Sequence, residues 1–192
     1  LPIFRGTNIF MDMFDDPDYV SRLLAYTTTI GETTAKLYVD AGADVVASVD
    51  PLVSQISPDH FAEFLSQPHT RLFRSIRALD AFSSFFVCGD ATRNIEVMCK
   101  TGPDGISIDE NIDMAHAKKV TDEYNVTIAG NIPLASVMLF GNQQDNMKVV
   151  IEELDSIDHH NLIVSPGCDM PYETPIENTI ACEQAVREPD QS

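Results

Sequence analysis

Long apolar runs are missing from this 192-residue sequence. No uninterrupted stretch approaches the roughly 20 apolar residues that a bilayer-spanning helix needs. A charged segment followed by an apolar one, the pattern of a secretory signal, is not visible either. We therefore expect no membrane span and a cytoplasmic protein.

Basic residues are also scarce. Twelve Lys and Arg stand against 30 Asp and Glu, which gives a formal net charge of −18. Such a surface repels phosphate backbones, so we expect no nucleic-acid partner. Two uses of the charge stay open: docking on a basic protein, or solubility alone.

Cysteine is sparse, and the four that occur are widely spaced and form no Cys-x-x-Cys pair. Without an export signal, this pattern predicts reduced thiols rather than a disulfide framework. Cys99 and Cys182 fall in predicted helices and are typical of small core residues. Cys88 and Cys168 each follow an apolar run and stand beside a glycine, so they need a separate explanation.

Short apolar runs alternate along the chain with amphipathic stretches. The runs are nearly continuous in Val, Ile and Phe, as in parallel strands covered on both faces. The predicted strands span residues 2–5, 44–49, 84–88, 105–109, 126–129 and 162–165. The predicted helices span residues 17–39, 58–79, 93–100, 114–124, 144–154 and 175–187.

Several helix starts carry explicit signals. Asp16, Ser57 and Thr174 each precede a proline suited to the first helical position. Thr174 and Glu177 also have the spacing of a capping box. No segment is rich enough in Pro, Gly or Ser to divide the chain, so residues 1–192 are expected to form a single domain.

Strand–helix units repeated about six times predict a parallel α/β protein, either an open doubly wound sheet or a (β/α)8 barrel. The first strand lacks a glycine-rich phosphate loop, which disfavours the doubly wound fold. Polar or thiol groups at the carboxyl ends of strands favour the barrel, where such groups meet on one face. These residues are Arg5, Asp50, Cys88 with Asp90, Asp109 with Glu110, Asn131, and Cys168 with Asp169.

Thiols and carboxylates at one barrel mouth are ligands that zinc accepts, and zinc would hold a thiol as thiolate. Asp109 could act as base, ligand or hydrogen-bond acceptor. Glu110 could do the same or cap the following helix, and Asp50 is either a functional group or a turn residue. No histidine ends a predicted strand, which excludes a Ser-His-Asp arrangement.

Four segments in order carry a family resemblance: FFVCGDATRNIE, ISIDENIDMAHAKK, TIAGNIP and SPGCDMPYETPIEN. They resemble the second half of the uroporphyrinogen decarboxylase superfamily, and more closely its corrinoid-dependent methyltransferase branch, which includes the methylcobamide:coenzyme M methyltransferases. The resemblance implies a (β/α)8 barrel to which this chain supplies about strands 3 to 8. The missing strands imply a homo-oligomer or a complementing chain.

For the site, the resemblance implies zinc held by a His-x-Cys pair and a later cysteine in a PGC turn. Cys88 and Cys168 match the two cysteines, but Phe86 stands at the histidine position. A substitute ligand would have to be Asp90, Asp109 or Glu110. The implied reaction moves a methyl group from a methylated corrinoid, carried by a partner protein, to a small-molecule acceptor, an activated thiol or a pterin.

Two alternatives remain. Uroporphyrinogen decarboxylase activity would need arginines and an aspartate from strands that this sequence does not show, although Arg5 and Asn131 could bind a substrate acid. A catalytically reduced barrel that only binds a partner would explain the loss of the histidine. The two cysteines and the strand-end carboxylates argue against this last interpretation.

Overall fold

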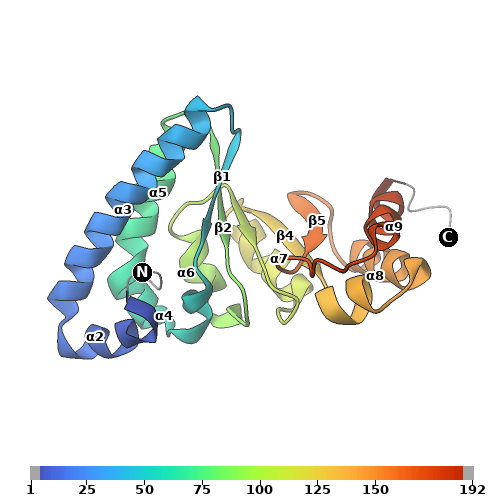
Figure 1. Ribbon diagram of the computed structural model, residues 1–192, viewed down its shortest axis with the longest axis horizontal. Helices are drawn as coiled ribbons and strands as arrows, with labels where there is room; N and C mark the ends of the chain where they lie inside the picture. The colour runs from blue at the N-terminus through green and yellow to red at the C-terminus, as the bar shows by residue number, and fades with distance from the viewer. Residues whose placement is uncertain (1–4, 188–192) are drawn as a thin grey trace.

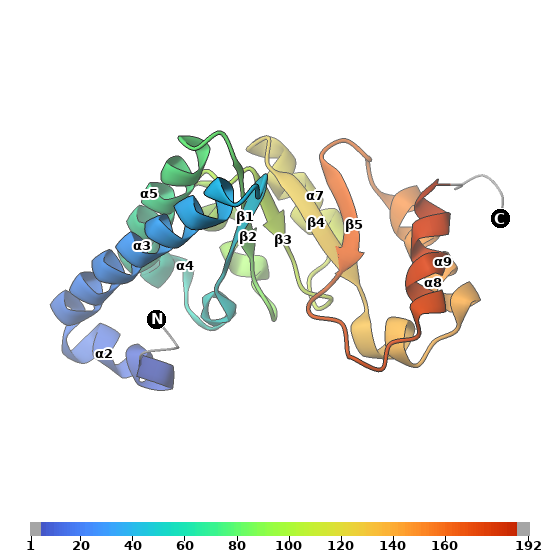
Figure 2. The same ribbon diagram turned by 45° about the horizontal axis from the view of Figure 1, so that its top comes forward.

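The computed structural model describes residues 5–187, and its centre is one sheet of five parallel strands (Figure 1). The strands are β1 (Val45–Val49), β2 (Phe82–Phe86), β3 (Gly105–Ser107), β4 (Thr127–Ile132) and β5 (Leu162–Pro166). Their order in the sheet is their order in the chain, and every pairing is parallel. A doubly wound sheet would reverse direction at a switch point, whereas a barrel adds each strand on the same side. The sheet is therefore the arc of an incomplete (β/α)8 barrel (Figure 2).

Helices connect the strands and cover the convex face of the arc. The α-helices are α2 (Ile9–Asp15), α3 (Pro17–Asp40), α4 (Pro58–His60), α5 (Ser66–Arg77), α6 (Ile95–Cys99), α7 (Met114–Glu123), α8 (Gln143–Ser156) and α9 (Ile176–Arg187). Short 3-10 helices are η1 (Gly6–Asn8), η2 (Pro51–Gln55) and η4 (Thr92–Asn94), and π-helices are η3 (Phe61–Leu65) and η5 (Leu134–Leu139). Figure 1 shows α3 and α5 at one end of the sheet and α8 and α9 at the other. None of the helices described here is long and apolar enough to cross a membrane.

Two of the predicted helix caps are confirmed. The Asp16 carboxylate accepts a hydrogen bond from the backbone N–H of Tyr19 at 2.9 Å, and the Ser57 hydroxyl accepts one from that of His60 at 3.2 Å. The capping box predicted at Thr174 is wrong, because its hydroxyl is buried without a hydrogen-bond partner. The capping box that the structure does contain is at Asn142, before α8.

The predicted strand at residues 2–5 can be compared with the structure only at Arg5. Residues 2–4 lie outside the described part of the chain, and Arg5 is helical rather than at a strand end. Its guanidinium Nη2 donates to Asp12 at 2.8 Å, an ion pair across the first helical turns. Helix α2, which contains Asp12, was not predicted, because seven residues are too few to display a helical period.

The hydrophobic core lies between the convex face of the sheet and the helices. Phe85 of β2 is fully buried against Phe61 and Phe73, with ring centroids 6.2 and 5.6 Å away. Ile106 and Ile128 continue the same face on β3 and β4 and are also fully buried. Burying an aromatic or branched side chain of this size contributes about 1.5–3 kcal/mol each, so this layer is what holds the arc together.

The concave face of the same sheet is apolar but uncovered among the described residues. Parallel partners share a face, and the register sets Val45 beside Phe82, and Ala129 beside Ile163. Val45, Phe82 and Ile163 are 57%, 61% and 54% exposed. In a closed barrel these positions are filled by side chains of other strands. The concave face is therefore as apolar as a protein interior, but its side chains are accessible to solvent.

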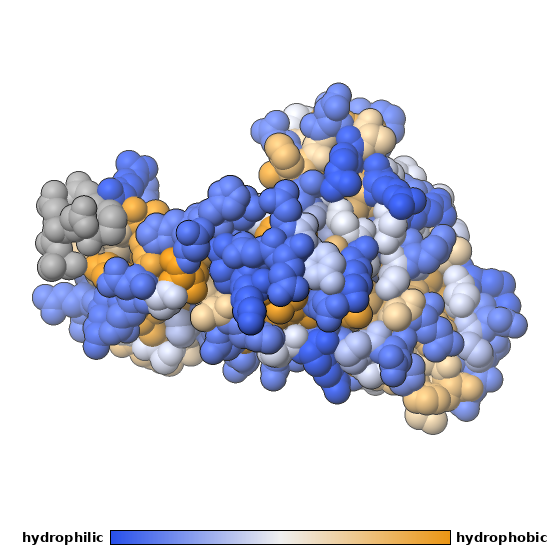
Figure 3. Space-filling view, turned by 180° about the vertical axis from the view of Figure 1, so that it is seen from behind, coloured by the Kyte–Doolittle hydropathy of each residue, from blue (hydrophilic) through white to orange (hydrophobic). Residues whose placement is uncertain are grey.

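Hydrophobic surface also flanks the β5 edge of the sheet. A groove of about 420 Å³ lies between β5 and α9 and is lined in part by Val164, Met170 and Val186. Figure 3 shows hydrophobic surface gathered over this end of the molecule. An unpaired strand edge beside apolar surface is a template for another strand.

We expect the purified chain to associate rather than remain monomeric, because association would cover the concave face. Replacing Phe82 and Ile163 by serine should shift the population toward monomer, as measured by size-exclusion chromatography with light scattering. Phe140→Ser is the matched control, since Phe140 is 79% exposed and lies outside the sheet. A stable, folded monomer of the unaltered chain would contradict this expectation.

Candidate functional site

The candidate site is the carboxyl edge of the sheet on its concave side. Cys88 follows β2 by two residues and Asp109 follows β3 by two, while Asn131 lies within β4. Cys168 follows β5, also by two residues. Parallel pairing aligns these strand ends, so side chains up to 80 residues apart in sequence meet at one mouth, as the sequence predicts for a barrel.

The two cysteines meet directly. The Sγ atoms of Cys88 and Cys168 are 2.7 Å apart, and both side chains are half-buried. Gly167 makes this approach possible, because a Cβ added there would lie 2.6 Å from the backbone nitrogen of Glu110. The turn after β5 therefore lies against the loop after β3 and carries Cys168 toward β2.

The Cys88 thiol is held in its protonated form at neutral pH. Burial raises its pKa to about 12, and the Cys168 thiol and the carboxylates of Asp109 and Asp169 act in the same direction. A thiolate there would need a cation or a further donor to stabilise it.

Asp109 serves as a hydrogen-bond acceptor that joins two loops. Its side chain is buried, and Oδ2 accepts a hydrogen bond from the backbone N–H of Gly89 at 2.8 Å. Oδ1 accepts from the backbone and the side-chain amide of Asn111. The carboxylate thus ties the end of β3 to the end of β2.

Glu110 and Asn131 extend this network to the next strand. A Glu110 carboxylate oxygen accepts from the backbone N–H of Leu134, at the start of η5. Asn131 Nδ2 donates to the carbonyl oxygens of Asp109 and Ile112, at 3.0 and 2.7 Å. Three of the predicted site residues therefore hold the rim of the mouth in place, whatever further role they have.

Asp90 does not complete a metal site with the sulfurs. Its carboxylate accepts from the backbone N–H and the hydroxyl of Thr92, at 3.0 and 2.6 Å, and so closes its own turn. Phe86 lies on the same strand as Cys88, two residues earlier, and offers no ligand. Across residues 5–187, no group of three or more His, Cys, Asp or Glu side chains is placed to hold a metal. A zinc site takes three or four protein ligands, so the described donor set does not fit one.

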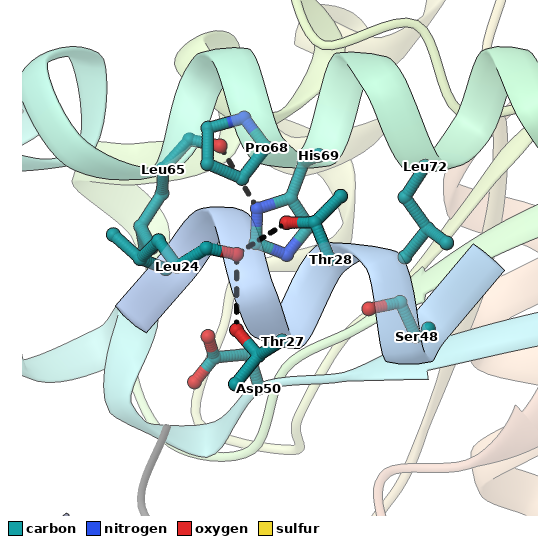
Figure 4. Close-up of a pocket in the computed structure, with 10 residues that line it drawn as sticks. Leu24, Thr27, Thr28, Ser48, Asp50, Leu65, Pro68, His69 and Leu72 are labelled. Carbon is teal, nitrogen blue, oxygen red and sulfur yellow. Dashed lines mark hydrogen bonds between the residues drawn. The ribbon is translucent and has the colours of Figure 1, made fainter. Parts of the chain in front are cut away.

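Asp50 lies apart from the cysteines, on the helix side of β1. Its carboxylate accepts from the backbone N–H of Leu52 at 3.2 Å, and it lines a cavity of about 180 Å³ between α3 and α5 (Figure 4). His69 lines the same cavity, and its Nδ1–H donates to the Leu65 carbonyl at 3.0 Å. Burial lowers the pKa of His69, which is stacked on Phe85 with ring centroids 4.4 Å apart. Asp50 therefore lines a cavity shared with a buried histidine and is not part of the mouth.

Glu153 on α8 is a titratable group that sequence analysis missed. Its Oε1 is buried without a hydrogen-bond partner, and burial raises its pKa to about 7, although a backbone hydrogen bond from Asn131 opposes the rise. The available signal was its position: Glu153 follows Asn146 by seven residues and Val150 by three, both of which are buried. Carboxylates are rarely buried, so a glutamate on the buried face of a helix can be recognised as a candidate for a shifted pKa.

The chain matches the uroporphyrinogen decarboxylase (URO-D) family over residues 5–189. It belongs to that family. The methylcobamide:CoM methyltransferase MtbA of Methanosarcina acetivorans is 29% identical over 177 residues, which cover 91% of this chain and 50% of that protein. The uroporphyrinogen decarboxylase of Prochlorococcus marinus (strain MIT 9312) is 30% identical, and the aligned residues cover 86% of this chain and 47% of that protein.

Among solved structures, a methyltransferase from Methanosarcina mazei superposes with a TM-score of 0.86 at 26% identity. The alignment covers 95% of this URO-D family chain and 53% of that one. The chain therefore spans about half the length of the relatives it matches, in agreement with a sheet that forms only part of a barrel.

Gly167→Ala should displace the turn that carries Cys168, because the new Cβ meets backbone rather than a flexible side chain. We expect a loss of about 1–3 kcal/mol in the free energy of unfolding, typical of overpacking, measured by urea denaturation. Gly105→Ala is the control, since its Cβ would make ordinary contacts at 3.5 Å. Equal stability of the two variants would show that the turn does not need glycine.

Glu153 should make stability depend on pH. Its folded-state pKa of about 7 lies above the ordinary value of 4.5, so the folded chain binds more protons between these two values. The free energy of unfolding should therefore fall as pH rises from 4.5 to 7. Glu153→Gln should remove this component and stabilise the chain at pH 8 in urea titrations. Glu152→Gln, at an exposed neighbouring position, should leave it intact.

Proposed function

We propose that this chain is part of a methyltransferase that moves a methyl group between a methylated corrinoid, carried by a partner protein, and a thiol or pterin acceptor. The observation that carries the proposal is the meeting of Cys88 and Cys168 at the mouth of the arc. Relatives named methylcobamide:CoM methyltransferases, 28–30% identical to this chain, support it.

Methyl transfer makes modest demands on the protein. A methylcobamide held by the partner protein would supply an electrophilic methyl carbon to the acceptor. The chain has to bind the acceptor, orient it toward the methyl group and exclude water. The rim made by Asp109, Glu110 and Asn131 is suited to orientation, because its hydrogen bonds hold three loops in fixed positions.

The floor of the mouth carries apolar side chains. Phe86 of β2 lies in the same layer of the sheet as Val49 and Ser107. Phe86 and Val49 offer an approaching acceptor no hydrogen-bonding group, and Ser107 offers one hydroxyl. The donor set does not fit a zinc ion, so no step of this proposal passes through one.

Decarboxylation of a porphyrinogen is the competing activity, since decarboxylases are among the relatives at comparable identity. Arg5, which the sequence suggested for binding a substrate acid, is engaged by Asp12. The stretch Ser165–Pro166–Gly167–Cys168 presents a thiol and no acid-binding side chain. Both features favour methyl transfer.

The direct test supplies methylcobalamin and 2-mercaptoethanesulfonate to the purified protein. We expect loss of the methylcobalamin absorption and formation of the methyl thioether, measured by spectrophotometry and mass spectrometry. Cys88→Ser and Cys168→Ser should each slow the reaction about 100-fold, equivalent to about 2.7 kcal/mol of transition-state stabilisation.

Cys99→Ser is the matched control, because Cys99 is buried in α6, away from the mouth. It should retain the activity of the unaltered protein. Release of carbon dioxide from uroporphyrinogen, with no methyl transfer, would instead assign the decarboxylase activity and refute the proposal.

A further inference from the structure

Independent elements position the two sulfurs of the mouth. On the β2 side, the backbone N–H of Val87 donates to the Ser107 carbonyl at 3.2 Å, and that of Gly89 donates to Asp109, so Cys88 is fixed on both sides. On the β5 side, the backbone N–H of Gly167 donates to the Ile132 carbonyl at 3.0 Å. A bond between the two sulfurs can therefore form without any rearrangement of the strands.

The separation of the sulfurs fits a covalent pair better than a shared metal. Two thiolates on one tetrahedral zinc, each at about 2.3 Å, stand about 3.8 Å apart. A disulfide places them about 2.05 Å apart. The observed 2.7 Å between the Cys88 and Cys168 sulfurs is nearer the second value. Phe86 supplies no third ligand, and the described side chains nearby form no metal-binding group.

We propose that Cys88 and Cys168 form a reversible disulfide that closes the mouth. With glutathione disulfide as oxidant, the Cys168 sulfur gives up its proton, attacks a glutathione sulfur and releases one glutathione thiol. The second cysteine then attacks the mixed disulfide at the protein sulfur and releases the other. Two protein S–H bonds are lost and one S–S bond is formed, and the two electrons reduce glutathione disulfide to two glutathione thiols.

The bond would tie β2 to β5 across the two strands between them, joining residues 80 positions apart. Cys99 and Cys182 are buried in α6 and α9 and cannot reach the mouth. The oxidised chain would therefore contain a single, defined cross-link. The inference does not depend on methyl transfer, because it concerns the sulfurs alone.

The test equilibrates the purified protein with glutathione disulfide, blocks remaining thiols in denaturant and maps peptides by mass spectrometry. We expect titratable thiols to fall from four to two per chain and one linked peptide pair containing Cys88 and Cys168. Excess reduced glutathione should restore all four. The cross-link should raise the Tm by roughly 5–15 °C, since it closes a long loop in the unfolded chain.

The controls separate this proposal from its competitors. Cys182→Ser should still form the link, whereas Cys88→Ser should not, and the unaltered protein gives the decisive peptide map even if a variant folds poorly. Four free thiols after equilibration, or links to other cysteines, would overturn the proposal. Zinc bound at about one per chain that blocks the link would overturn it too. The experiment contains no corrinoid or methyl acceptor. If the disulfide does not form, the proposed methyl transfer is therefore not refuted and is decided by its own assay.

Discussion

The pairing of five parallel strands in chain order is the constraint on which the rest of the structure depends. Each strand joins its predecessor on the same side, so the carboxyl ends of the five strands lie along one edge, and helices cover one face of the sheet. That arrangement divides the apolar residues of the strands into a buried layer, with Phe85 and Ile106, and an uncovered layer, with Phe82 and Ile163. The first layer packs against the helices, and the second is open to solvent among the described residues.

The mouth is built mainly from hydrogen bonds between loops. Asp109, Glu110 and Asn131 each bond to backbone groups of another loop, and Gly167 allows the last turn to lie against the loop after β3. Buried carboxylates and amides satisfied in this way make a rim rigid, because releasing one leaves a polar group unpaired in low dielectric. A rigid rim holds a reacting partner in a defined orientation, and it also fixes the two cysteines.

The cysteines show how a family pattern and an individual chain can differ. Membership of the URO-D family is shown, and Cys88 and Cys168 meet at the carboxyl edge of the sheet. Phe86 and the turn closed by Asp90 leave the pair without a third ligand among the described residues. The mouth therefore contains two sulfurs in contact, and burial keeps the pKa of the Cys88 thiol high.

The sequence by itself determined the repeating strand–helix order, the parallel sheet and the strand ends at which functional groups gather. These follow from local patterns: continuous Val, Ile and Phe runs, caps such as Asp16, and the Pro-Gly turn before Cys168. The helix formed by residues 9–15 and the helical state of Arg5 were not predicted from the sequence, because short elements show too little periodicity. Thr174 has the spacing of a capping residue, but its hydroxyl is buried and has no hydrogen-bond partner.

Only the tertiary structure decided which polar groups are engaged and with what. That Asp50 lines a cavity with His69, away from the cysteines, depends on which face of β1 it occupies beyond the strand end. The burial of Glu153 depends on how α8 packs near Asn131. The contact between Cys88 and Cys168 depends on register across four strands and on one glycine. Hydrogen bonding and burial at the mouth are properties of segments far apart in sequence, which local patterns do not encode.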